Sequence, residues 1–548
     1  MAQEYKIKGL SGLDLKSGEK REVEVEGIEN GKVLLAKVGD KTHAMSSNCT
    51  HYGAPLKLGV LTPDGRLTCA WHGACFNVGT GDVEDAPALD PLAKFEIIEK
   101  SGGVYIKGDE KTIQASRRSV NTSCKAQGQE KVVIVGGGSG SIGAVQALRE
   151  QGYKGAVTLI HSEPYLPIDR TKLSKALIAD KSKITLRPEE WFKDSSIETL
   201  QDEVTDVDFK SKTVSTASGS SHQYTKLILA TGGNPKALPL PGFKELENIF
   251  LLRQIPDVQA INSAVGEKAG KKIVVIGSSF IGMEVANCLA SQKNEVTVVG
   301  MESVPMERIM GAEVGKIFQN LVGKNGVKFH MSAGVEAAEP SSKNKKAVGS
   351  IKLKDGTVLE CDLVVVGAGV SPATGFLKDN SAVKLQDDGS LLTDESFAVK
   401  GLSDVFAIGD IATYPYHGPG SDGTLTRIEH WNVAQNAGRS VARSITTPSA
   451  KPKPFIPVFW SAMGSQLRYC GNTPNGWDDL VLQGEPKEGK FSAFYGKGDT
   501  VVAVASMQMD PIMSQSAELM RRGKMPGMAE LRKGTDVRDI GVPGEVKM

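Results

Sequence analysis

Cys49-Thr50-His51 and Cys69-Ala70-Trp71-His72 are two short stretches that seventeen residues separate. Each stretch supplies one thiolate and one imidazole, two side chains that bind transition metals readily. Turn-forming residues follow both stretches: Gly53, Pro55, Gly73, Gly79 and Gly81. Such residues let a backbone approach a metal centre closely. The spacing therefore predicts two facing loops that clamp a metal centre, and a Cys2His2 zinc site is its simplest form.

The four residues also resemble the Rieske [2Fe-2S] family, in which two thiolates hold one iron and two imidazoles hold the other. The resemblance implies that the cluster ligands are Cys49, His51, Cys69 and His72. Ala74 and Phe76 stand where respiratory-chain Rieske proteins carry a Ser and a Tyr, and Ala54 and Trp71 stand where those proteins carry an extra cysteine pair. Fewer hydrogen bonds to sulfur make reduction less favourable, so we expect a potential of roughly −150 mV. That value suits a cluster fed from NADH.

Length and composition limit the classes of function. A chain of 548 residues contains several domains, and its net charge of +1 argues against direct nucleic-acid binding. Its seven cysteines do not make a disulfide framework, which favours a reducing compartment. We find no apolar run of roughly eighteen residues and no signal-peptide or presequence pattern. We therefore expect a cytoplasmic monomer or homodimer without a membrane span, and a mitochondrial location stays open.

Residues 1–108 differ in pattern from the remainder of the chain. They contain short alternating segments between glycine turns, which predicts a small all-β domain. Residues 109–129 are polar and without periodicity, which is typical of a linker, and Cys124 within them is not expected to be a ligand. Beyond residue 130, apolar strands alternate with helices, which predicts parallel α/β sheets.

Two of these α/β units begin alike. Lys131–Val135 runs into Gly136-Gly-Gly-Ser-Gly-Ser141, and Lys272–Ile276 runs into Gly277-Ser-Ser-Phe-Ile-Gly282. An apolar strand, a glycine turn and a helix are the context in which a dinucleotide pyrophosphate binds a helix N-terminus. The predicted cofactor-binding positions are Gly136, Gly138, Ser141, Gly277, Ser279 and Gly282. Ser141 replaces the third glycine, and its hydroxyl is a candidate phosphate ligand. A shifted register over Gly138, Gly140 and Gly143 is the alternative.

Acidic residues after the second strand of each unit are candidate ribose ligands. Glu163 occupies this place in the first unit and Glu302 in the second. No arginine follows at 301–303 to hold a 2′-phosphate, which favours NADH. Arg308 keeps NADPH open as the alternative.

Three further segments, Ala230–Gly233, Val364–Gly369 and Val405–Asp410, resemble the pyridine nucleotide–disulfide reductase superfamily. The resemblance implies that Asp410 binds the ribitol of FAD and that Arg170 and Lys175 flank the flavin. It also implies that Glu284 lies near the nicotinamide. It extends cofactor binding to Val204, Thr231, Gly369, His430 and Trp460. The implied domains are Rieske 1–108, linker 109–129, FAD-binding 130–255 and 377–450, NAD(P)H-binding 256–376 and an α+β C-terminal domain 451–548.

The combination of domains resembles apoptosis-inducing-factor-like proteins and bacterial ferredoxin reductases. Leu166–Leu177 lacks the C-x4-C pair of disulfide reductases, and the eight histidines offer no second iron site. We therefore expect an FAD enzyme that passes electrons from NADH to the fused cluster and on to an unidentified acceptor. Lys175 and Glu284 are its candidate catalytic residues and should form an ion pair. The alternative is a cell-death or stress-signalling protein whose redox site controls conformation and partners. Met520–Met525 is expected in a packed helix.

Overall fold

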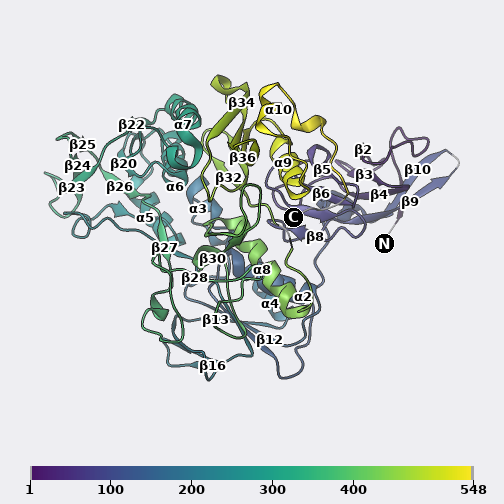
Figure 1. Ribbon diagram of the computed structural model, residues 1–548, viewed down its shortest axis with the longest axis horizontal. Helices are drawn as coiled ribbons and strands as arrows, with labels where there is room; N and C mark the ends of the chain where they lie inside the picture. Colours follow the sequence, from purple (N-terminus) through teal and green to yellow (C-terminus); the bar gives the residue numbers. More distant parts are fainter. Residues whose placement is uncertain (1–2, 101, 454, 545–548) are drawn as a thin grey trace.

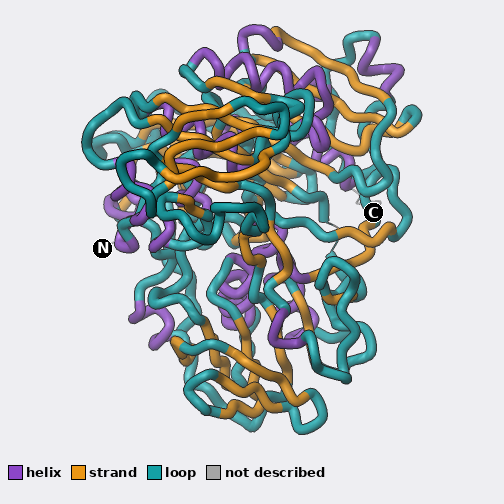
Figure 2. The backbone as a smooth tube through the Cα atoms, turned by 90° about the vertical axis from the view of Figure 1, so that its left-hand side faces the viewer, coloured by secondary structure: helices purple, strands orange, loops and turns teal. Residues whose placement is uncertain are grey.

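The computed structural model describes residues 3–100, 102–453 and 455–544. Figure 1 shows four regions, with the N-terminal domain (purple) at one side and the unit expected to bind FAD, called the FAD-binding unit below, at the lower end. The second nucleotide unit (teal) and the C-terminal domain (yellow-green) lie above the FAD-binding unit in both Figure 1 and Figure 2. No helix in the described part of the chain combines the length and apolarity that crossing a membrane requires.

The N-terminal domain is all-β, as its alternating pattern predicts. Its larger sheet has the order β1 (Gln3–Lys6), β10 (Gly103–Gly108), β9 (Lys94–Lys100), β4 (Lys41–Ser46), β3 (Lys32–Val38) and β2 (Lys20–Glu24). Its smaller sheet has the order β5 (Val60–Leu61), β6 (Arg66–Thr68), β7 (Cys75–Asn77) and β8 (Val83–Asp85). Both sheets are antiparallel, and the two metal motifs lie in the loops after β4 and β6.

The FAD-binding unit is a parallel sheet with the order β13 (Ile197–Gln201), β12 (Ala156–His161), β11 (Lys131–Val135), β17 (Lys226–Leu229) and β29 (Val405–Ala407). Helices α2 (Ser139–Glu150) and α8 (Trp431–Thr446) cross with their backbones in close contact, because small residues line the crossing. A Cβ on Gly143 would lie 2.3 Å from the Gln435 carbonyl oxygen, and one on Gly438 would lie 2.1 Å from that of Gly140. Gly140 and Gly143 of the shifted register therefore serve this helix crossing, whereas Gly138 lines the cavity before α2.

The second unit repeats the arrangement. Its parallel sheet has the order β19 (Ile249–Phe250), β26 (Leu363–Val366), β20 (Lys272–Ile276), β21 (Glu295–Val299) and β22 (Lys328–His330). Its helices are α5 (Ile255–Val265), α6 (Phe280–Ser291) and α7 (Glu307–Lys324). Small antiparallel sheets extend the two units, namely β14 (Val204–Asp208), β15 (Thr213–Thr216) and β16 (Ser221–Gln223) in the first, and β23 (Val335–Pro340), β24 (Val348–Leu353) and β25 (Val358–Glu360) in the second.

The C-terminal domain is an antiparallel sheet backed by two helices. The sheet has the order β32 (Val458–Ala462), β33 (Gln466–Gly471), β36 (Thr500–Met507), β35 (Lys490–Lys497) and β34 (Asp479–Glu485). Helices α9 (Ile512–Arg521) and α10 (Met528–Arg532) follow it. Every residue of α9 is buried, but the helix ends at Arg521, so only the first two residues of the segment Met520–Met525 lie in the expected packed helix and the others follow it in a turn and a loop. Figure 1 shows α9 beside the small sheet of the N-terminal domain.

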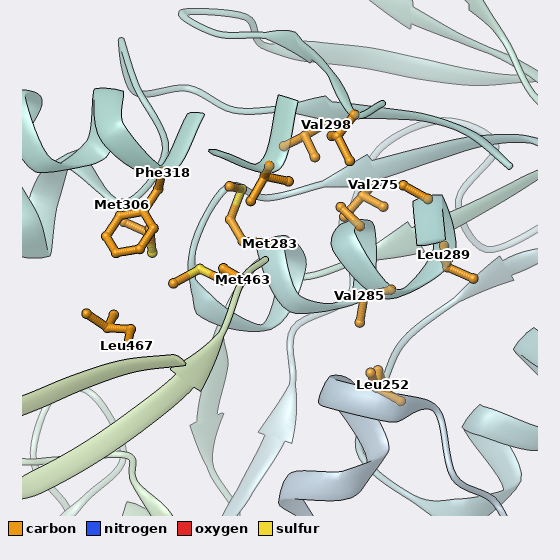
Figure 3. Close-up of a cluster of buried hydrophobic side chains, with 14 of the residues drawn as sticks. Leu252, Val275, Met283, Val285, Leu289, Val298, Met306, Phe318, Met463 and Leu467 are labelled. Atoms are coloured by element: carbon orange, nitrogen blue, oxygen red, sulfur yellow. The ribbon is translucent and has the colours of Figure 1, made fainter. Parts of the chain in front are cut away.

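One apolar core joins the FAD-binding unit, the second unit and the C-terminal domain. Figure 3 shows Met283 and Leu289 of α6, Leu252 before α5, and Met463 and Leu467 of the β32–β33 hairpin in this cluster. Burial of so many large side chains in one cluster stabilises the relative position of the three regions.

The segment predicted as a linker contains a short helix, α1 (Glu110–Ala115). The Asp109 side chain caps this helix, and Ile113 packs into the core of the N-terminal domain. Farther along, the hydroxyls of Thr122 and Ser195 lie 2.7 Å apart, so the segment is also attached to the FAD-binding unit.

Candidate redox site

The two metal-motif loops have the same backbone geometry. In the first loop, the Cys49 N–H donates to the Ala54 carbonyl at 2.8 Å, and the Gly53 N–H donates to the Cys49 carbonyl at 2.9 Å. The corresponding residues of the second loop are Cys69, Ala74 and Gly73, with distances of 2.8 and 3.2 Å. Both glycines adopt a positive φ, of 76° and 73°. That conformation strains other residues, which explains the glycine four positions after each cysteine.

The loops bring the four predicted ligands together as two pairs. The Nδ1 atoms of His51 and His72 lie 3.1 Å apart, and the thiols of Cys49 and Cys69 are buried and close enough to affect each other's ionisation. The neighbouring Cys49 thiol lowers the pKa of Cys69, and backbone N–H groups of its own loop lower it further. The same proximity of the thiols raises the pKa of Cys49. A bound cluster would take both cysteines as thiolates, with release of both thiol protons.

Both imidazoles of the site are neutral at pH 7, since burial lowers the pKa of His51 to about 3 and that of His72 well below its usual value. Neutral imidazole is the form that binds a metal. Two thiols on one side and two neutral imidazoles on the other fit the donor set of a Rieske [2Fe-2S] cluster.

A single cavity of about 1850 Å³ lies between the two nucleotide units and the C-terminal domain. Typical ligand pockets enclose about 300–1,000 Å³, so this cavity has room for two dinucleotides. The predicted cofactor-binding residues that line it are Gly136, Gly138, Glu163, Arg170, Lys175, Val204, Thr231, Gly277, Ser279, Glu284, Glu302, Gly369, Asp410, His430 and Trp460. The structure thus brings together at one cavity residues from Gly136 to Trp460, which are 324 positions apart in the sequence.

Ser141 and Gly282, the third positions of the two glycine motifs, lie behind the cavity wall. The Ser141 hydroxyl donates to the Gly136 carbonyl at 2.5 Å, and the residue is fully buried. A Cβ on Gly282 would lie 2.0 Å from the Gly277 carbonyl oxygen. The structure therefore differs from the expectation that the Ser141 hydroxyl reaches a phosphate, because this hydroxyl already closes the turn.

Two predicted acids of the FAD-binding unit are held by arginines at the cavity wall. Glu163 accepts two hydrogen bonds from the Arg170 guanidinium, at 2.9 and 2.7 Å. Asp410 accepts one from Arg253 at 3.0 Å. Such charge-assisted bonds fix the carboxylates and leave their remaining lone pairs for ligand hydroxyls.

Lys175 and Glu284 form the predicted ion pair, with Nζ and Oε1 2.9 Å apart. Glu284 is 3% exposed, and its other oxygen accepts from the Ser174 hydroxyl at 2.6 Å. Ser461 of β32 donates to Oε1. This hydroxyl joins the pair to the C-terminal domain and keeps the carboxylate fixed at the cavity wall.

Trp460 lies between this cavity and the metal loops. Its ring centroid is 4.4 Å from that of His72, 5.5 Å from that of His51 and 5.3 Å from that of His430. The side chain is 3% exposed, and its indole N–H has no hydrogen-bond partner in the part of the chain that the structure describes. Because buried donors are normally paired, a ligand group in the cavity that Trp460 lines would supply the missing acceptor.

Three comparisons with known proteins agree with this geometry. Family models match a Rieske [2Fe-2S] domain over residues 7–96, a pyridine nucleotide-disulphide oxidoreductase over 130–438 and a reductase C-terminal domain over 458–540. Apoptosis-inducing factor 3 of Homo sapiens is 39% identical over 520 residues, which cover 93% of this chain and 83% of that protein. The chain belongs to the pyridine nucleotide-disulphide oxidoreductase family.

The chain is also similar to rhodocoxin reductase and to a solved putidaredoxin reductase complex. Rhodocoxin reductase of Rhodococcus erythropolis is 31% identical over 410 residues, 74% of this chain and 92% of its own length. The solved covalent putidaredoxin reductase–putidaredoxin complex superposes with a TM-score of 0.69 at 26% identity, covering 75% of this chain and 98% of that chain. These findings confirm an NAD(P)H oxidoreductase with FAD and a Rieske [2Fe-2S] cluster, and they favour electron transfer over the signalling alternative.

The contacts between the Rieske domain and the reductase were not apparent from sequence. Tyr52 stacks on His51 at 3.7 Å and donates its hydroxyl to Asp169 of the FAD-binding unit. Lys172 Nζ lies 3.8 Å above the Tyr52 ring. No motif marks Tyr52, but its position directly after a cluster ligand is a signal that could have singled it out.

Helix α9 of the C-terminal domain holds the same Rieske domain from the other side. The Ser514 hydroxyl donates to the Cys69 carbonyl at 2.8 Å, and Glu518 accepts from Thr68 at 3.1 Å. Arg522, which is fully buried, bonds Asp64 at 2.7 Å. The second cluster loop therefore takes its position partly from the C-terminal domain.

Proposed function

We propose that this chain oxidises NADH in the large cavity and delivers the electrons singly to its own Rieske domain, with Trp460 and His72 as the connection. The single observation that carries the proposal is the position of Trp460, which lines the nucleotide cavity and also contacts a cluster ligand at 4.4 Å. When bound, FAD supplies the conversion from two-electron to one-electron chemistry, and the [2Fe-2S] cluster supplies a one-electron carrier.

The residues of the chain bind and orient these groups. The glycine turns at Gly136 and Gly277 would hold the pyrophosphates at helix N-termini. Asp410 would bind a ribitol hydroxyl of FAD. Lys175 would place a positive charge at the flavin end of the cavity, and Glu284 would orient the carboxamide end of NADH. Cys49, His51, Cys69 and His72 would hold the cluster.

NADH is the proposed coenzyme because Glu302 lines the second half of the cavity, where a ribose 2′-hydroxyl would find a carboxylate. Arg308 and Lys354 line the same region, and either could pair with a 2′-phosphate. The ratio of turnover with NADH to that with NADPH tests this choice. A preference for NADPH would assign the specificity to the two cations.

The fused Rieske domain would act as a built-in redox partner. The solved putidaredoxin reductase complex joins a reductase covalently to putidaredoxin, whereas this chain carries a [2Fe-2S] domain on the same polypeptide. The final acceptor is a separate molecule that takes electrons from the Rieske domain. None of the seven cysteines, all of which lie in the described residues, forms a disulfide, which supports a compartment with reduced thiols such as the cytosol.

Replacement of Trp460 tests the connection. Trp460→Leu should leave NADH-dependent bleaching of the flavin intact and slow the appearance of the reduced cluster, whereas Trp460→Phe should retain part of the rate. Stopped-flow absorbance separates the two steps. Trp191→Leu is the matched control, since Trp191 lies on α4 (Glu189–Asp194) and does not line the cavity. Unchanged cluster reduction in Trp460→Leu would contradict the proposed connection.

A further inference from the structure

Arg468 lies beside Trp460, where the C-terminal domain contacts the second cluster loop. The two residues are cross-strand partners in the β32–β33 hairpin, so their side chains project from the same face. Trp460 packs on His72, and the Arg468 Nε–H donates to the Trp71 carbonyl at 3.1 Å. The hairpin of the C-terminal domain thus touches two adjacent residues of the Rieske loop, one through an aromatic ring and one through a guanidinium.

The guanidinium of Arg468 is a buried charge with one nearby counter-charge. Its side chain is 7% exposed, and Nη1 lies 2.8 Å from Oδ1 of Asp510, whose side chain is 20% exposed. Burial lowers the pKa of Arg468, but a guanidinium remains protonated in proteins at neutral pH. The guanidinium bonds the backbone two residues after the ligand Cys69 and one residue before the ligand His72, which places its charge beside the cluster loop.

We propose that Arg468 raises the reduction potential of the cluster. The potential then depends on the contact between the Rieske domain and the C-terminal domain. The inference rests on the cluster site described above. One-electron reduction adds one negative charge at the cluster, and a positive charge in a poorly solvated position stabilises the product more than the reactant. The cluster loop has Ala74 and Phe76 in place of hydroxyl donors. The guanidinium of Arg468, which belongs to the reductase, therefore supplies stabilisation of the reduced cluster that the loop itself does not provide. Asp510 opposes the effect through its negative charge.

The test is a redox titration of the intact, cofactor-loaded chain, with the cluster followed by absorbance and electron paramagnetic resonance. Arg468→Gln should make cluster reduction about tenfold less favourable, which is ~59 mV for a one-electron couple. Asp510→Asn should shift the potential upward, and Arg468→Lys should keep most of the wild-type value. Arg532→Gln is the matched control, because Arg532 pairs with Asp479 at 2.6 Å on the surface of the same domain.

Arg468→Gln and Asp510→Asn should shift the reduction potential in opposite directions if charge is the cause. Loosening of the cluster loop would shift it in the same direction in both. A downward shift in both Arg468→Gln and Asp510→Asn, or equal potentials in Arg468→Gln and Arg532→Gln, would overturn the inference. If Arg468→Gln does not fold, Asp510→Asn decides alone, and an unmoved potential there would refute the role of Arg468. A wild-type chain without a Rieske spectrum would instead refute the cluster site itself.

Discussion

Removing the positive partner of the Lys175–Glu284 pair should destabilise the protein by leaving a carboxylate buried and unpaired. Glu284 is 3% exposed and Lys175 has 18% of its side chain exposed, so water has little access to either group. Breaking a buried pair from one side costs about 3–5 kcal/mol. Glu284 keeps the hydroxyl donors of Ser174 and Ser461, so we expect Lys175→Met to cost about 3 kcal/mol.

That cost should appear in the temperature at which flavin is released. About 3 kcal/mol corresponds to roughly 6–12 °C for a cooperative unit of 150–250 residues. Glu284→Gln in the Lys175→Met background should raise this temperature, because it removes the unpaired charge, whereas Glu284→Gln alone should lower it. Lys193→Met is the control: Lys193 contacts Glu189 at 2.7 Å, but both side chains are exposed, and the temperature should stay unchanged.

The reversal of sign is the decisive result. If Glu284→Gln lowers the release temperature equally in both backgrounds, the two side chains do not interact and the reasoning fails. The same variants test function in stopped-flow experiments. Loss of Lys175 should slow flavin bleaching more than it weakens NADH binding, and loss of Glu284 should raise the NADH requirement more than it slows bleaching.

Two further predictions concern the separate cofactor sites. Cys49→Ser or His72→Ala should abolish the Rieske spectrum while FAD stays bound and is still bleached by NADH, because the cluster loops and the FAD cavity are built from different domains; release of FAD in these variants, or one zinc in place of two irons in the wild type, would contradict this. Asp410→Ala should weaken FAD retention, since a charge-assisted hydrogen bond contributes roughly 1.5–3 kcal/mol; flavin fluorescence on dilution measures the loss, and wild-type retention would remove Asp410 from the site.

Local chemistry explains which features could be predicted from sequence. The glycine turns, the strand before each turn and the cysteine–histidine loops each depend on a few neighbouring residues. The local sequence pattern is therefore enough to predict them. The cavity-lining positions followed from the resemblance, which relates distant segments such as those of Glu163 and Asp410. The expected contact of the Ser141 hydroxyl with a phosphate was wrong, because a serine hydroxyl can bond to several nearby acceptors. In the structure it donates to the carbonyl of Gly136.

The contacts between domains could not be predicted, because no local pattern encodes which surfaces meet. Tyr52 and Asp169 are 117 positions apart, and Arg468 reaches Trp71 across 397 positions. A half-buried tyrosine, a buried arginine and a helix with buried polar side chains could each pack against many different partners, and the isolated sequence does not say which. Their partners become apparent only in the structure, where the Rieske domain packs against the reductase.

Covalent fusion also explains how such a polar interface can hold the Rieske domain. Arg66, Glu518 and Arg522 have side chains that are 7%, 4% and 0% exposed at this junction, and burying charges costs free energy even when they pair. Two separate proteins would in addition lose about 4–15 kcal/mol of translational and rotational freedom on association. Within one chain this loss is largely absent, so charged contacts need only fix orientation. The arrangement favours a constant distance between cavity and cluster over the reversible docking of a free carrier, and the external acceptor must therefore approach a cluster that is already held against Trp460.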